Sequence, residues 1–178
     1  MKDEVLLQLS SSSFLLPPSS FSPVLLYLLR HANADTIAES DDVRTLTEKG
    51  HTQAEKVAHF CAARELRPEV ILSSPLPRAQ QTAAPIGEKL GVEVIVAPWL
   101  ASGMMPEGAT DALRDYVRFE SVLLVGHEPD FSLLIAHLLG LPDHARFVVR
   151  KASLTLLEFR SPRAGAATFH FSLPCRLM

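Results

Sequence analysis

The sequence has few of the features that mark several common protein classes. Its two cysteines form no CxxC pair, so neither a disulfide framework nor a cysteine-rich metal site is indicated. Both thiols are expected to be reduced, as in a cytoplasmic protein. The absence of HExxH, Walker A and GxGxxG sequences leaves a zinc site of that kind and nucleotide binding by a glycine loop without support. No apolar run approaches the roughly 18 residues of a membrane-spanning helix, so no membrane contact is expected.

The numbers of basic and acidic residues are also nearly equal. The chain has 17 lysines and arginines against 20 aspartates and glutamates, a formal net charge of −3, so no nucleic-acid partner is expected and any anion must be attracted locally. Residues 1–23 are rich in serine and proline and are expected to form a disordered extension, while residues 24–178 form one domain. The hydrophobic content of 47% suits such a compact domain.

Two apolar runs end in a histidine. Residues 24–29 are apolar throughout and lead into Arg30 and His31, and residues 122–125 lead through a glycine into His127. Short, uniformly apolar runs predict strands that are buried on both faces and are usually parallel and central. Because open α/β sheets place ligands at the carboxyl ends of their strands, the three polar side chains are expected at one edge of a sheet.

Strands and helices alternate over the first 140 residues, which predicts an α/β fold with a mostly parallel sheet of about six strands and helices on both faces. Residues 101–108 are expected to be a flexible loop, and the last two strands are expected to be antiparallel neighbours. The expected strands are 24–29, 70–73, 92–96, 122–125, 154–159 and 168–173, and the expected helices are 48–66, 77–90, 110–118 and 131–139, with Thr47 and Asp130 as N-caps of the first and last.

The polar residues that follow the strands favour an anion site. Arg78 follows the strand at 70–73, so two arginines and two histidines could converge on one small anion, for which phosphate is the natural candidate. An arginine stays charged and presents a planar fork that matches two phosphate oxygens. The alternatives to a role in anion binding are that each arginine is a solvated surface side chain and that each histidine is a hydrogen-bonded structural residue. A metal site is disfavoured, because the arginines would repel a cation.

The motifs around these residues resemble the histidine phosphatase superfamily, in its phosphoglycerate-mutase-like branch. The resemblance rests on residues 29–32 (LRHA), 73–82 (SSPLPRAQQT) and 125–129 (VGHEP), and the run RTLTEKG at 44–50 is similar to SixA-type phosphohistidine phosphatases. It implies a three-layer phosphoglycerate-mutase-like fold and an enzyme that needs no metal or cofactor. It also implies that His31 is the nucleophile and forms a phosphohistidine intermediate, that Arg30, Arg78 and His127 surround the phosphoryl group, and that Arg44 binds the phosphate.

One departure from the family concerns the general acid. Larger members supply a carboxylate after the third strand, where this chain offers only Glu107, with Glu128 as a second candidate. Weak provision of an acid favours a phosphoramidate substrate, because a phosphohistidine imidazole can be protonated before it leaves. The expected partner is therefore a protein that carries phosphohistidine, such as a phosphotransfer domain; the sequence does not indicate an oligomeric state. The alternatives are a phosphatase or mutase of a small metabolite and a catalytically silent phosphate-binding module.

Overall fold

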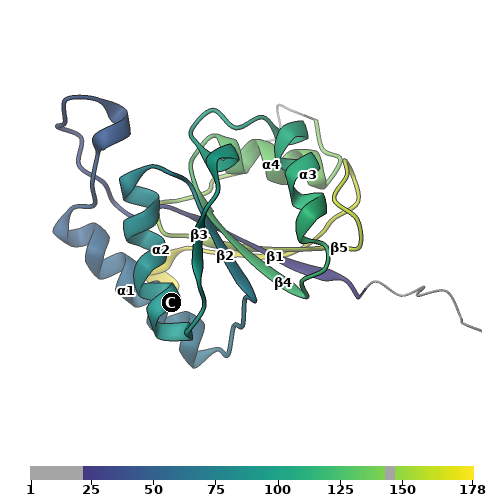
Figure 1. The fold of residues 1–178 in the computed structure, drawn as a ribbon, viewed down its shortest axis with the longest axis horizontal. Helices are drawn as coiled ribbons and strands as arrows, with labels where there is room; N and C mark the ends of the chain where they lie inside the picture. Colours follow the sequence, from purple (N-terminus) through teal and green to yellow (C-terminus); the bar gives the residue numbers. More distant parts are fainter. Residues whose placement is uncertain (1–21, 143–146) are drawn as a thin grey trace, which may run out of the picture.

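The computed structural model describes residues 22–142 and 147–178 and shows a sheet between two layers of helices (Figure 1). The sheet has the strand order β3-β2-β4-β1-β5-β6, in which β5 runs antiparallel to both of its neighbours and the other five strands run in one direction. The predicted fold class is confirmed. Residues 1–21 of the expected extension lie outside the described residues. The strands are β1 (Val24–Arg30), β2 (Val70–Ser73), β3 (Val94–Val96), β4 (Ser121–Gly126), β5 (Leu154–Phe159) and β6 (Thr168–Leu173).

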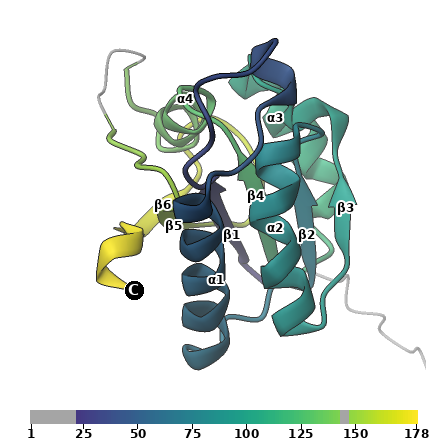
Figure 2. The ribbon, with the colours of Figure 1, turned by 90° about the vertical axis from the view of Figure 1, so that its left-hand side faces the viewer.

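The helices divide between the two faces of the sheet. Helices α1 and α2 pack on one face, and α3 and α4 pack on the other, as Figure 1 and Figure 2 show. Within the described residues no helix combines the length and the apolar content that a membrane crossing requires. The α-helices are α1 (Glu48–Ala63), α2 (Pro77–Leu90), α3 (Pro106–Leu113) and α4 (Asp130–Leu138), and the 3-10 turns are η1 (Asp41–Val43), η2 (Pro98–Leu100), η3 (Arg114–Tyr116) and η4 (Cys175–Leu177).

Strand β1 contributes side chains to both cores. Leu26 and Leu28 lie in the core under α3 and α4, whereas Tyr27 and Leu29 lie in the core under α1 and α2. All four side chains are buried, which explains why the strand is apolar at every position instead of at alternate ones. The strand is therefore held in a fixed register, and the residues that follow it have fixed positions.

The start of α1 depends on Thr47 and Gly50. The Thr47 hydroxyl accepts a hydrogen bond from the Gly50 amide, so the threonine is the predicted N-cap. A Cβ atom on Gly50 would lie 2.0 Å from the Asn33 carbonyl oxygen, so only glycine allows the helix to approach the segment that follows β1 this closely. The helix start is thus tied to the loop that carries His31.

Two local predictions are wrong. Helix α3 begins at Pro106 and ends at Leu113, earlier than the expected 110–118, because a proline fits the first position of a helix. Asp130 is the first residue of α4 and does not cap it; its Oδ2 accepts hydrogen bonds from the amides of Gly103 and Met104, at 2.9 and 3.3 Å. The segment expected to be flexible is therefore bonded to the start of α4.

Candidate active site

The carboxyl ends of three neighbouring parallel strands carry the residues of the site. The register pairs Arg30 of β1 with Gly126 of β4, and Ser73 of β2 with Val125 of β4. The residues that follow these pairs are His31, His127 and Ser74, so they lie side by side at one edge of the sheet. The rings of His31 and His127 have centroids 5.3 Å apart.

His31 is held as a neutral ring with one nitrogen free. Its Nδ1 lies 2.8 Å from the carbonyl oxygen of Ala32, and because a carbonyl only accepts, Nδ1 carries the proton and Nε2 keeps a lone pair. The side chain is buried, with 6% of its surface exposed. Burial, and then the nearby charges of His127, Arg78 and Arg30, lower the pKa of His31 to about 3. The ring is therefore uncharged at neutral pH.

His127 is positioned by Ser74. The ring nitrogen Nε2 lies 2.7 Å from the Ser74 hydroxyl, which also accepts a hydrogen bond from the Leu76 amide at 3.3 Å. When this hydroxyl donates to Nε2, the proton of the neutral ring lies on Nδ1. Burial, followed by the charge of Arg78, lowers the pKa of His127 to about 4. His127 can therefore offer an N–H donor while remaining uncharged.

The two arginines predicted for the site are each anchored by hydrogen bonds from their terminal nitrogens. Arg30 donates from Nη1 to the Val149 carbonyl at 2.8 Å, and Arg78 donates from Nη1 and Nη2 to the carbonyl and carboxylate oxygens of Asp41, at 2.6 and 2.8 Å. The Nε atoms of both arginines and Nδ1 of His127 are buried and have no hydrogen-bond partner among the described residues. An unpaired buried donor costs about 1–3 kcal/mol, so three of them around one histidine fit a site built to bind an anion.

Asp41 is a site residue that the sequence analysis missed. Its carboxylate joins Arg78 to Arg44, whose Nη1 lies 2.6 Å from Asp41 Oδ1 and whose Nε donates to the carbonyl of Asp35. The hydrogen bond from Arg44 is the main reason that the pKa of Asp41 is lowered. Arg44 is thus connected to the site through Asp41. Only the spacing of three residues between Asp41 and Arg44 could have indicated this pair.

Lys151 adds a further cation that the sequence analysis did not identify. The next amide in the chain, that of Ala152, donates to the carbonyls of Arg30 and His31 at 3.0 and 3.2 Å, which places the lysine backbone beside the histidine. Burial and then the charges of Arg30, Arg44 and Lys49 lower the pKa of Lys151. Positive charge therefore accumulates at this edge although the whole chain is slightly acidic.

The two carboxylates considered as general acids differ in position. Glu107 lies in the first turn of α3 and is exposed, and its nearest partner is His137, with 3.9 Å between Oε1 and Nδ1. Glu128 is half-buried, with one oxygen bonded to the Ser132 hydroxyl and Oε2 buried without a partner among the described residues. Burial raises the pKa of Glu128, and the charge of Arg30 acts against this.

The described residues contain no group of three or more histidine, cysteine, aspartate or glutamate side chains placed to hold a metal ion. The cations at this edge of the sheet would also repel a metal ion. We call it the catalytic edge because it carries His31, the expected nucleophile. The chemistry that the site can support is therefore the binding of a tetrahedral anion by fixed N–H donors, with the Nε2 lone pair of His31 as the nucleophile.

Comparison with known proteins gives the same family as the motifs. The model of the histidine phosphatase superfamily (branch 1) matches residues 26–102. The phosphohistidine phosphatase SixA of Escherichia coli K12 is 30% identical over 161 residues, which cover 85% of this chain and 94% of that protein. A probable phosphoglycerate mutase GpmB of Enterobacter sp. strain 638 is 35% identical over 96 residues, which cover 50% of this chain and 44% of that protein.

The fold also matches a solved structure of the protein histidine phosphatase SixA complexed with tungstate. The TM-score is 0.77 with 24% sequence identity, and the match covers 86% of this chain and 98% of the other. The chain therefore belongs to the histidine phosphatase superfamily, branch 1, and is a phosphatase.

Proposed function

We propose that this phosphatase removes the phosphoryl group from a histidine of a protein, with His31 as the nucleophile. The observation that carries the proposal is the state of His31, a buried neutral ring whose Nδ1 is bound to a carbonyl and whose Nε2 keeps its lone pair. An imidazole in this state needs no separate base to become nucleophilic. The name of the relative that is 30% identical, a phosphohistidine phosphatase, supports the same substrate class.

In the first step the Nε2 lone pair of His31 attacks phosphorus while the bond from phosphorus to the substrate imidazole breaks. The electron pair of that bond returns to the imidazole, which leaves as a neutral ring if its other nitrogen was already protonated. Charge on the equatorial phosphoryl oxygens is stabilised by the Nε–H groups of Arg30 and Arg78 and by Nδ1–H of His127. In the second step water attacks the phosphohistidine on His31, which releases phosphate and restores the neutral ring.

The arrangement of carboxylates supports a phosphoramidate substrate over a phosphate ester. An alkoxide leaving group requires a proton as it departs, whereas an imidazole can be protonated beforehand. Glu107 is exposed and pairs with His137 instead of either arginine of the site. Glu107 is therefore not placed to protonate an ester oxygen, and phosphohistidine does not require such an acid.

The second candidate function is a phosphatase or mutase of a small phosphorylated metabolite. Glu128 is the observation in its favour, because its raised pKa and its position near Arg30 suit a carboxylic acid that donates a proton. The relative named as a probable phosphoglycerate mutase is consistent with this candidate. The two functions are distinguished by substrate, since both use the same nucleophile.

The test offers three substrates side by side: a phosphotransfer domain phosphorylated on histidine, a phosphoserine peptide and 3-phosphoglycerate. We expect turnover of the first substrate to exceed that of the other two. We also expect a rapid alkaline quench to trap radiolabelled phosphate on His31 in a form that acid removes. His31→Ala should abolish both turnover and labelling, and the matched control His51→Ala, at an exposed position of α1, should change neither. Preferred turnover of 3-phosphoglycerate would select the second candidate, and normal turnover by His31→Ala would exclude both.

A further inference from the structure

A cationic groove runs along α1, beside the last turn of the chain. Two adjoining hollows form it, with volumes of about 330 and 510 Å³, and Lys56 lines both. Figure 2 shows α1 descending from the loops of the catalytic edge, with the C-terminal turn η4 at its side. The first hollow is lined by Lys49, Thr52, Gln53, Lys56, Cys175 and Arg176, and the second by Lys56, His59, Phe60, Ala63, Arg64 and Met178. We call these two hollows the α1 groove.

The charged side chains that line the α1 groove have one sign. Lys49, Lys56, Arg64 and Arg176 are its charged residues, and no aspartate or glutamate lines it. None of these four cations forms an ion pair with another described residue, although Arg64 lies over the Phe60 ring at 5.9 Å. Although the chain has a net charge of −3, these four unpaired cations create a positive potential along the groove. This potential attracts an acidic surface.

The groove begins at the catalytic edge. Lys49 lies in the first turn of α1, two residues after Thr47, whose amide donates to the Asn33 carbonyl two residues beyond His31. The charge of Lys49 also acts on Lys151, beside the histidine. From Lys49 to Ala63 the helix rises about 21 Å at 1.5 Å per residue. A ligand that fills the groove and also reaches His31 is therefore much longer than a small metabolite.

We propose that the α1 groove is the docking surface for an acidic face of the protein whose phosphohistidine enters the active site. The proposal rests on the proposed function, and three features of the groove support it: its length, its positive charge and its apolar residues. A protein surface can meet Phe60 and Met178 with apolar side chains and the four cations with carboxylates. A nucleic acid would leave the apolar residues without partners, because its surface toward such a groove is phosphate and sugar.

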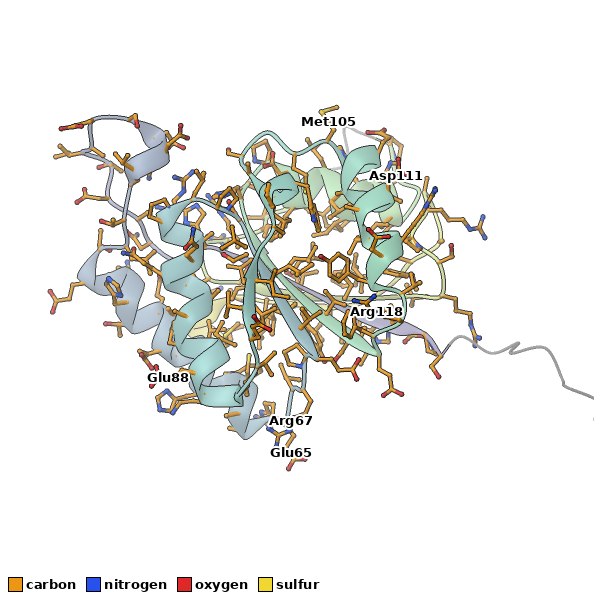
Figure 3. All side chains as sticks on the ribbon, viewed as in Figure 1. Glu65, Arg67, Glu88, Met105, Asp111 and Arg118 are labelled. Carbon is orange, nitrogen blue, oxygen red and sulfur yellow. The ribbon has the colours of Figure 1, made fainter. Side chains whose placement is uncertain are left out.

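The test compares a large and a small substrate of the same chemistry. Lys56→Glu/Arg176→Glu reverses two exposed charges of the groove without touching the residues of the site. The matched control, Arg67→Glu/Arg163→Glu, makes the same change in net charge elsewhere; Arg67 lies at the end of the molecule opposite Met105 in Figure 3. The substrates are a phosphorylated acidic phosphotransfer domain and free phosphohistidine, at low and at high salt.

For the groove variant we expect KM for the phosphorylated domain to rise at least tenfold at low salt, and this difference to shrink at high salt. Its turnover of free phosphohistidine should match that of the wild type, and the control variant should match the wild type on both substrates. Equal KM values for the groove variant and the wild type, or equal losses in both variants, would overturn the proposal. The proposal would also be overturned if a DNA duplex inhibited turnover of the phosphorylated domain and the unphosphorylated acidic domain did not. Failure of the wild type to hydrolyse either substrate would instead refute the proposed function.

Discussion

Acidification from pH 7 to pH 5 should destabilise the protein through His31 and His127. The folded-state pKa values of these residues are about 3 and about 4, whereas an unfolded chain gives a histidine its ordinary value of 6.5. Below about pH 6.5 the unfolded state therefore binds more protons than the folded state, and the free energy of unfolding falls as the pH falls. Each histidine accounts for a loss of about 2 kcal/mol between pH 7 and pH 5, or about 4 kcal/mol together.

The measurement is urea unfolding at both pH values, for the wild type and for His31→Gln/His127→Gln. The variant should lose about 4 kcal/mol less than the wild type between pH 7 and pH 5, whatever its stability at pH 7. A control, His51→Gln, removes an exposed histidine and should keep the wild-type loss. Equal losses in the wild type and in His31→Gln/His127→Gln would mean that the buried rings accept protons while folded. Burial would then not be what keeps His31 neutral, contrary to the reasoning from its surroundings.

The other predictions concern the remaining groups of the site. Arg78→Lys should lower kcat/KM for phosphohistidine by about tenfold or more, because a lysine cannot bind Asp41 and also direct an Nε–H at the phosphate. The control Arg114→Lys, at an exposed ion pair, should leave kcat/KM unchanged. Ser74→Ala should lower kcat, and NMR of labelled His127 should show a changed proportion of its two tautomers, which Ser73→Ala should not produce. A chelator should leave turnover unchanged, since the reaction as proposed uses no metal; loss of activity that added metal restores would contradict it.

The sequence predicts most of the framework because its signals are local. Uniformly apolar strands and the Thr47 cap each act within a few residues, and each appears in the structure. Helix α3 shows the limit of such signals: Pro106 and Gly108 suggest a loop, yet a proline in the first turn is compatible with a helix. Asp130 failed as a cap because its carboxylate found partners in another loop, which no local pattern encodes.

The site residues divide in the same way. The positions of Arg30, His31, Arg78 and His127 were predictable because each lies at or shortly after the end of a strand, and parallel strands end at a common edge. Asp41 and Ser74 were not singled out, because their importance comes from contacts with Arg78 and His127, which are distant in sequence. Lys151 was missed for a related reason: it precedes a strand, and only the bonds from Ala152 to the backbone of Arg30 and His31 show that it lies beside the site.

The register between β1 and β4 connects the framework of the fold with the residues of the site. Because Arg30 pairs with Gly126, the histidines that follow occupy equivalent positions on adjacent strands, and their rings are close enough to act on one phosphoryl group. A shift of one residue in β1 would turn His31 toward the opposite face of the sheet and exchange the side chains that the two cores receive. The apolar residues of β1, which make such a shift costly on both faces, therefore also fix the distance between the rings of His31 and His127. The same burial lowers the pKa values of both histidines, so the packing that positions the rings also keeps them neutral.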